Sequence, residues 1–177
     1  RSTLFPYTTL FRSTNLDQTM AHKKKEIDFE QNVRDIIGEI KEYGFGMLND
    51  MIDPQFVDCD PAKQSCRVRY KKFKWEDNGR GEVHGGVISA MMDTTMGINA
   101  IALTSDSVST ADMTISFLRP FTGKSFIVES EAVQLGSRVI RLMAKAYDEE
   151  TGKCLAMSTG SFMHVDYDYT QGKQLGV

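Results

Sequence analysis

The chain has 177 residues, of which 41% are hydrophobic and 25% are charged, and its formal net charge is -3 at pH 7. This composition is typical of one globular domain with a substantial core, and it excludes a disordered or low-complexity chain. The slightly acidic balance argues against nucleic acid or an anionic membrane surface as the main partner.

The sequence contains three isolated cysteines and shows no pattern of metal ligands. Cys59, Cys66 and Cys154 form no CxxC pair, and the histidines are not at ligand spacing from other metal-binding residues. An odd number of separate cysteines favours reduced thiols over a disulfide framework. We therefore expect a cytoplasmic protein with no metal or other cofactor.

No segment has the pattern of a membrane span or a signal peptide. The longest apolar run, residues 87–103, contains Asp93, Asn99 and several hydroxyl side chains, which argues against a transmembrane helix. The N-terminus lacks a basic head followed by an apolar stretch.

The N-terminal part divides into two predicted segments. Residues 1–19 include TLFPYTTLFRS, which resembles a translated sequencing adapter, and we expect an assembly artefact or a disordered leader there. Residues 20–54 form a predicted helical segment, because apolar residues recur at helical spacing between Glu26 and Tyr43. Gly44 and Gly46 end this amphipathic helix.

Residues 55–166 form the predicted main domain, which begins with two strands and a long helix. The strands flank a turn at Pro61, and the second strand alternates apolar and basic residues. A polar, glycine-rich loop from Asn78 to Gly86 follows. The helix then runs to about Thr104, because alanine and methionine dominate a stretch that is too long for one strand.

Four predicted strands complete the domain. They lie in ADMTISFLRP, KSFIVESEAVQLG, SRVIRLMAKAY and KCLAMSTGSFMHV, and the apolar set of the first is Ala111, Met113, Ile115 and Phe117. The short connections between them indicate an antiparallel meander. We therefore predict an α+β fold with one antiparallel sheet wrapped around the long helix, followed by a loose polar tail over residues 167–177.

Asp93 lies in the middle of the long helix, on a face of small residues. The residues within about 60° of it on a helical wheel are Gly86, Ser89, Ala90, Met96, Gly97 and Ala100. A buried carboxylate without a partner is costly. Asp93 is therefore either a hydrogen-bonded structural residue or a base or nucleophile facing a cleft, and helical geometry leaves both open.

The start of the helix offers a second candidate feature. At Gly85 and Gly86 the first backbone N–H groups have no internal partner, and glycine lets a carbonyl oxygen come close. This arrangement suits an oxyanion hole, although Gly-Gly pairs are also common in tight turns. His84 and Asn78 lie in the same loop, where they either take part in chemistry or anchor the loop.

These residues make the chain similar to the hotdog-fold acyl-CoA thioesterases, in particular the phenylacetate-pathway (PaaI-like) group of the 4-hydroxybenzoyl-CoA thioesterase superfamily. The similarity runs from about Phe56 to Val165. It is carried by Asn-x5-His-Gly-Gly-x6-Asp, from Asn78 to Asp93, and by STADMTISFLRP and LGSRVIRLMAKAYDEETGKCLAMSTGSF. The resemblance implies a hotdog fold and hydrolysis of an acyl- or aryl-acyl-CoA to the free acid and CoA.

The resemblance also implies a role for each matching residue. The Gly85 N–H would polarise the thioester carbonyl, and Asp93 of the facing subunit would act as general base or nucleophile. Asn78 would position the thioester or the water, and His84 would hold the loop or assist the leaving thiolate. Thr110 stands where some relatives have a serine that orients water, and it adds a methyl group to that hydroxyl.

Substrate contacts and assembly are implied in the same way. Gly86 would admit the substrate carbonyl, and Ser137 and Arg138 are candidates for contacts with pantetheine or phosphate. A solvated surface charge is an equally good interpretation of Arg138. The family works as a homodimer, commonly paired into a homotetramer, with active sites between subunits.

Two other functions remain open at this point. The same fold could hold an acyl-CoA as a sensed ligand without hydrolysis, or it could act as a hydratase or dehydratase, for which a carboxylate in mid-helix is unusual. The acyl group is also open, because Met91, Met92, Met96 and Phe117 could shape an aliphatic or an aryl pocket.

Overall fold

The computed structural model describes residues 28–43, 46–165, 167–168 and 173–174. The expectations for residues 1–19, and for the first residues of the N-terminal helix, lie outside this part of the chain. The division of the sequence into segments 1–19, 20–54, 55–166 and 167–177 stays a prediction.

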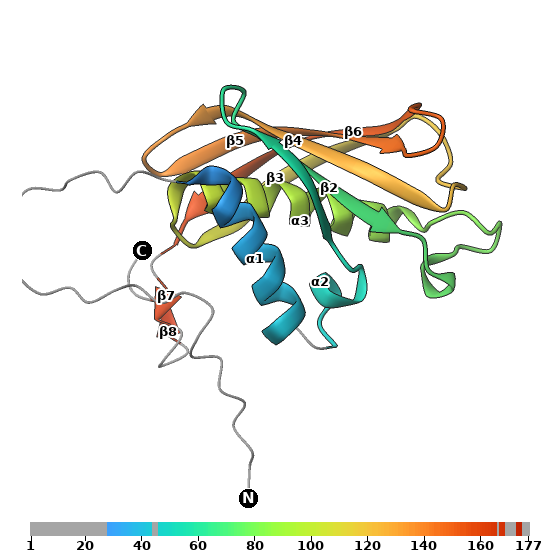
Figure 1. The fold of residues 1–177 in the computed structure, drawn as a ribbon, viewed down its shortest axis with the longest axis horizontal. Helices are drawn as coiled ribbons and strands as arrows, with labels where there is room; N and C mark the ends of the chain where they lie inside the picture. Colours follow the sequence, from blue (N-terminus) through green and yellow to red (C-terminus); the bar gives the residue numbers. More distant parts are fainter. Residues whose placement is uncertain (1–27, 44–45, 166, 169–172, 175–177) are drawn as a thin grey trace, which may run out of the picture.

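A six-stranded antiparallel sheet curves around one long helix (Figure 1). Its strands are β1 (Gln55–Asp60), β2 (Ser65–Lys71), β3 (Val108–Phe117), β4 (Ser125–Leu135), β5 (Val139–Asp148) and β6 (Cys154–His164). They pair in the order β1-β2-β4-β5-β6-β3, so β1 and β3 form the two edges. The wrapped antiparallel sheet and the core helix confirm the predicted α+β hotdog fold. The predicted meander of the last four strands is wrong for β3, which pairs with β6 and not with β4.

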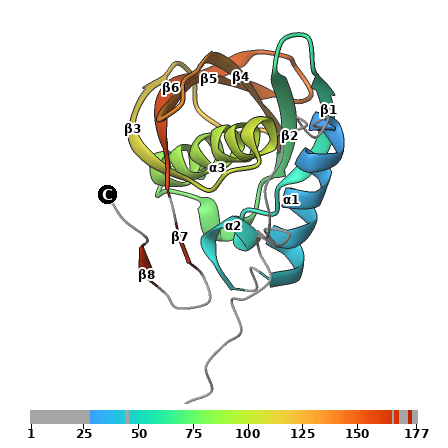
Figure 2. The same ribbon diagram turned by 90° about the vertical axis from the view of Figure 1, so that its left-hand side faces the viewer.

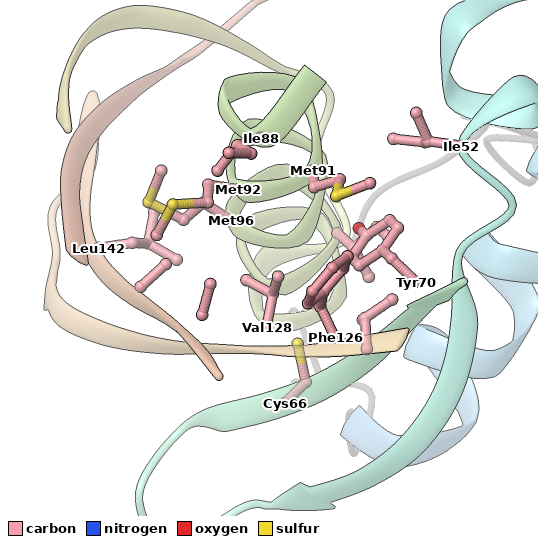
Figure 3. Close-up of a cluster of buried hydrophobic side chains, with 14 of the residues drawn as sticks. Ile52, Cys66, Tyr70, Ile88, Met91, Met92, Met96, Phe126, Val128 and Leu142 are labelled. Carbon is pink, nitrogen blue, oxygen red and sulfur yellow. The ribbon is translucent and has the colours of Figure 1, made fainter. Parts of the chain in front are cut away.

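Helix α3 (Gly85–Thr104) lies in the hollow of the sheet, which arches over it from β2 to β3 (Figure 2). Met91, Met92 and Met96 are fully buried, and Met92 and Met96 extend toward Leu142 of β5 (Figure 3). By length and composition, with a mean hydropathy of 1.3, α3 could cross a membrane. Its position inside the sheet instead identifies it as the core helix of this fold.

Buried polar groups fix α3 on the sheet. The hydroxyls of Tyr70 and Thr95 are 2.8 Å apart, and Asn99 Nδ2 donates to the carbonyl oxygens of Ser130 at 3.1 Å and Gln64 at 3.2 Å. An unpaired buried polar group costs more than its hydrogen bond contributes. These pairs therefore favour a single register of the helix against β2 and β4.

Two helices flank α3 on the side of β1 and β2. Helix α1 (Phe29–Tyr43) begins where the Asp28 carboxylate accepts from the Gln31 N–H at 3.0 Å, and its Asn32 side chain donates to the Ala102 carbonyl at 3.0 Å. This confirms the predicted amphipathic helix over the described residues. Helix α2 (Leu48–Met51) was not predicted, because four residues are too few for a periodic signal.

Two smaller findings add to the sequence predictions. The three cysteines are free thiols, but Cys59 and Cys66 are register partners in β1 and β2 rather than distant residues. Burial raises the pKa of the Cys59 thiol to about 12. The tail contains the short strands β7 (Tyr167–Asp168) and β8 (Lys173–Gln174), which pair with each other, so the expectation of a wholly loose tail is not met there.

Candidate active site

Helix α3 begins with a backbone donor that no described residue uses. His84 is the N-cap residue, and its ring Nδ1 accepts from the Gly86 N–H at 3.0 Å. The carbonyl oxygen of His84 accepts from the N–H groups of Val87 at 2.9 Å and Ile88 at 3.1 Å. The Gly85 N–H has no acceptor within the described part of the chain. This donor at the positive end of a helix can therefore bind an oxygen atom of a ligand.

The same contact assigns a structural role to His84. Because Nδ1 accepts a hydrogen bond, the neutral ring carries its proton on Nε2. The side chain is otherwise exposed. The ring thus caps the helix and orders Gly86, and its Nε2–H faces outward.

Asn78 anchors the loop that leads to this helix. Its side-chain oxygen accepts from the backbone N–H groups of Arg80 at 2.8 Å and Glu82 at 3.3 Å, and its amide nitrogen donates to the Glu82 carboxylate at 3.4 Å. Asp77 and Val83 form an isolated β-bridge across the base of the loop. Both ends of the Asn78 amide are thus engaged within the loop, which favours the anchoring role.

Beneath this loop lies a buried carboxyl group that the sequence did not reveal. Glu76 has no exposed surface, and its Oε2 accepts from the Phe73 N–H at 3.0 Å. Its Oε1 has no hydrogen-bond partner among the described residues, and burial raises the pKa of this carboxyl group. The Glu76 carbonyl accepts from the His84 N–H at 2.7 Å, so Glu76 supports the N-cap of α3 from below.

Asp93 and Thr110 meet across the helix and the edge strand. The Thr110 hydroxyl donates to Asp93 Oδ1 at 2.8 Å. A β-bulge between Thr110 and Asp112 adds one residue to β3, so Thr110 pairs with Phe162 and Ala111 has no partner on β6. Both residues are exposed, but the Thr110 side chain is the one that contacts the helix. The predicted inward position of Ala111 is therefore wrong, and Thr110 takes the inward face at that end of the strand.

The helix face around Asp93 is partly open. Asp93, Ala90 and Gly97 are half-buried and Gly86 is exposed, whereas Met96 and Ala100, from the same predicted face, are fully buried. On the side away from β3, the Thr94 hydroxyl donates to Asn49 of α2 at 3.0 Å. An accessible strip of small residues thus runs along α3 between β3 and α2, with the Asp93 carboxylate in it.

Gly85 and Asp93 lie too far apart to act on one bond within a single chain. Asp93 stands eight positions after Gly85 in the helix, which corresponds to about 12 Å along the axis. A thioester carbonyl bound at the Gly85 N–H is therefore beyond the reach of the same chain's carboxylate. The two groups can meet at one substrate only if a second subunit supplies one of them.

Ser137 and Arg138 lie near the other end of α3. They are exposed in the turn between β4 and β5, and the Arg138 carbonyl accepts from the His164 N–H at 3.1 Å. The His164 ring contacts Asp106, which follows the C-terminus of α3, at 3.1 Å. Within one chain, this turn is therefore not brought together with Gly85.

The side chains considered for an acyl pocket separate into two groups. Met91, Met92 and Met96 belong to the core, whereas Phe117 is 53% exposed. The Phe117 ring lies 3.5 Å from the point where a Cβ on Gly85 would stand. Of these four side chains, Phe117 is therefore the one that lies beside the N-terminus of α3. Within the described residues, no group of three or more His, Cys, Asp and Glu side chains could hold a metal ion.

Comparisons with known proteins agree with this fold. The sequence profile of the thioesterase superfamily matches residues 80–155. A presumed esterase of Saccharolobus solfataricus is 30% identical over 114 residues, which cover 63% of this chain and 78% of that protein. A presumed esterase of Halobacterium salinarum is 30% identical over 87 residues, which cover 46% of this chain but only 57% of that relative.

Solved structures show the same fold at low sequence identity. The PaaI protein of the E. coli phenylacetic acid degradation operon is 16% identical, with a TM-score of 0.67 over 78% of this chain and 96% of that one. A Streptococcus mutans protein with bound acetyl-CoA is 18% identical, with a TM-score of 0.58 over 63% of this chain and 87% of that one.

The six-stranded antiparallel sheet wrapped around α3 defines a hotdog-fold protein. The profile match and the relative from Saccharolobus solfataricus identify its family. The chain belongs to the thioesterase superfamily.

Proposed function

We propose that this protein is an acyl-CoA thioesterase that hydrolyses an acyl- or aryl-acyl-CoA to the free acid and CoA. The observation that carries the proposal is the hydrogen bond from Thr110 to Asp93 on the open strip of α3. This hydrogen bond orients Oδ1 of the Asp93 carboxylate, and no described residue donates a hydrogen bond to Oδ2. A carboxylate held in this way can accept a proton from water or attack a carbonyl carbon directly.

The Gly85 N–H is the proposed oxyanion donor. It lies at the positive end of the α3 dipole and has no acceptor among the described residues, whereas the neighbouring Gly86 N–H is bonded to His84. A preorganised donor stabilises the negative charge that develops on the thioester oxygen in the transition state. Gly86 has no side chain to obstruct the approach of the carbonyl group.

The reaction follows from these two groups. In the general-base route Asp93 takes a proton from water as the water oxygen bonds to the thioester carbon, and the carbonyl electron pair moves onto the oxygen at Gly85. The tetrahedral intermediate then re-forms the carbonyl, breaks the C–S bond and releases the CoA thiolate, which gains the proton. In the nucleophile route the carboxylate attacks the thioester carbon first and the C–S bond breaks to release the CoA thiolate. Water then hydrolyses the resulting anhydride, which frees the acid, restores the Asp93 carboxylate and supplies the proton that the thiolate gains.

A composite site between two subunits is part of the proposal. The separation of Gly85 and Asp93 along α3 supports a site in which the two groups come from different chains. Strand β3 supports pairing with a second copy, because β6 is its one strand neighbour among the described residues and none of its ten residues is buried. We propose a homodimer, or a homotetramer built from two such dimers, that works in the cytoplasm with reduced thiols.

The test is release of free thiol from a panel of short, medium, long and aryl acyl-CoAs by the purified protein. Asp93→Asn keeps the shape of the side chain and is expected to lower kcat by about 10²–10⁴-fold, the usual contribution of a general base. Asp112→Asn is the matched control, because Asp112 lies on the outer face of the same strand as Thr110, beyond the bulge.

Other outcomes of this assay would favour a different function or a different catalytic residue. Tight binding of acyl-CoA without thiol release by the wild-type protein would replace the enzyme with a sensor. Consumption of an enoyl-CoA without thiol release would indicate a hydratase. Equal turnover by the wild type and Asp93→Asn would remove Asp93 from the mechanism.

A further inference from the structure

The loop that leads into α3, residues 77–83, is closed at its base. Asp77 and Val83 form a β-bridge. Next to this bridge the His84 N–H donates to the Glu76 carbonyl at 2.7 Å. The base of the loop therefore fixes the backbone of His84, which is the N-cap residue of α3, and with it the peptide group that follows.

A lysine side chain joins this loop to the sheet. Lys72 follows β2, and its backbone N–H donates to the Lys124 carbonyl at 2.9 Å, directly before β4. Its Nζ donates to the Gly81 carbonyl at 2.6 Å and forms an ion pair with Asp77 Oδ1 at 2.8 Å. Gly81 lies in the loop beyond the β-bridge and Asp77 lies at its base, so one ammonium group holds both parts.

The surroundings of Lys72 distinguish it from its neighbour Lys74. The Lys72 and Asp77 side chains are only 18% and 11% exposed, whereas Lys74, which contacts Asp77 Oδ2 at 2.9 Å, is 92% exposed. Water screens an exposed ion pair and leaves it little net strength, but a largely enclosed pair keeps more of its attraction. Lys72 is therefore the cation that restrains the loop.

The restraint extends to the proposed oxyanion donor. Asp77 is the next residue after Glu76, whose carbonyl holds the His84 N–H, and the His84–Gly85 peptide carries the Gly85 N–H. A donor of this kind stabilises the transition state only where it points at the developing charge. A misplacement of about 1 Å can cost about a hundredfold in rate.

We propose that Lys72, paired with Asp77, is a positioning residue that holds the loop before α3 and thereby sets the direction of the Gly85 N–H. The inference rests on the proposed thioesterase function and adds a residue on which its oxyanion donor depends. Lys72 does not touch the reacting atoms. Because the donor acts mainly in the transition state, loss of Lys72 lowers kcat and leaves KM nearly unchanged.

The first test is thiol release by three variants. Lys72→Met keeps an unbranched apolar side chain and removes the charge, and kcat should fall by about tenfold while KM stays within about twofold. Lys72→Arg keeps a charged donor and should recover most of kcat. Lys74→Met removes the exposed partner of the same carboxylate and should behave as the wild type. Thermal unfolding checks that every variant is folded.

A double-mutant cycle with Gly85→Pro, which lacks the N–H group, separates positioning from general stability. If Lys72 acts through this donor, Lys72→Met should cause no further fall in kcat in the Gly85→Pro chain. A lysine that only stabilises the fold would lower kcat by the same factor in both backgrounds. That result, or a normal kcat of Lys72→Met alone, would contradict the positioning role.

Amide hydrogen exchange measured by NMR tests the restraint without turnover. Lys72→Met should speed the exchange of the His84 and Gly86 amides by about tenfold, as expected for loss of one hydrogen bond from a charged group, and leave the β4 and β5 amides unchanged. Lys74→Met should exchange as the wild type does. A wild-type protein that releases no thiol would contradict the proposed function alone, whereas unchanged exchange at both loop amides in Lys72→Met would exclude the restraint.

Discussion

Thr110 donates a hydrogen bond of 2.8 Å to Asp93, and it does so from an edge strand that is paired on one side only. The bond connects the open strip of the core helix to the strand at which we propose that two subunits meet. It holds Asp93 Oδ1 and leaves Oδ2 without a donor among the described residues. The direction of the free oxygen thus depends on a single neighbouring hydroxyl.

Removal of that hydroxyl should reduce turnover without loss of the fold. Thr110→Val keeps the side-chain shape, and we expect kcat to fall by about ten- to a hundredfold, which corresponds to one hydrogen bond to a charged group. Thr110→Ser should retain most of the activity. Steady-state thiol release measures both variants, and a Thr110→Val enzyme with normal kcat would show that the bond has no catalytic role.

Gly85→Pro tests the oxyanion donor. Proline lacks the N–H group but is favoured at the first position of a helix, and the preceding His84 has the extended backbone that proline requires, with φ -63° and ψ 138°. We expect kcat to fall by about 10²–10³-fold. Gly85→Ala keeps the N–H and is the control for the added bulk beside Phe117. A proline variant as active as the alanine variant would place the donor elsewhere.

Co-expression of two inactive chains tests whether the site is shared. In a dimer of one Gly85→Pro chain and one Asp93→Asn chain, one of the two sites receives both intact groups. Random pairing should therefore restore about a quarter of the wild-type activity. Each variant alone should remain inactive. No recovery from a mixture shown to contain heterodimers would place both groups in one chain.

Glu76 should make stability depend on pH. Burial raises its pKa above the ordinary value of 4.5, so the folded chain binds this proton more tightly than the unfolded chain does. Stability is therefore lost as pH rises from the unfolded pKa through the raised folded pKa. Glu76→Gln removes this titration, so its free energy of unfolding relative to the wild type should be more favourable at pH 8 than at pH 4.

Urea unfolding at the two pH values measures this difference. Glu82→Gln provides a control, because Glu82 lies in the same loop and its pKa is lowered by Arg80 and Asn78. Its stability relative to the wild type should change with pH in the opposite direction. If the difference in unfolding free energy between Glu76→Gln and the wild type is the same at both pH values, folding does not raise the pKa of this carboxyl group.

Much of the fold was accessible from the sequence, because its signals are local. The helix from Gly85 to Thr104 is too long and too rich in alanine and methionine to be a strand, and the short connections after β4 correctly predict the antiparallel run β4-β5-β6. The place of β3 beside β6 was missed, because a short connection does not require consecutive strands to pair. The small-residue face around Asp93 follows from helical geometry alone. The open strip found there has the expected position, although burial of Met96 and Ala100 makes it narrower.

The contacts between distant segments could not be predicted in this way. Nothing in the strand sequence indicates that Ala111 is an extra residue in β3. The extra residue shifts the alternation of side chains, so that Thr110 and not Ala111 faces the helix. Burial of Glu76 depends on the loop folding over it, and its sequence neighbour Trp75 is 45% exposed. The contact between His164 and Asp106 joins residues that are 58 positions apart, so no local pattern could indicate it.

Ala111 shows that a residue can contribute through its presence in the chain rather than through its side chain. Thr110 pairs with Phe162 and Asp112 with Ser161, so both pairs would survive if Ala111 were deleted. The strand would lose the local bend that a bulge imposes, and with it the direction in which Thr110 approaches the helix. Substitution of Ala111 should therefore be nearly silent, whereas its deletion should impair turnover and spare the sheet.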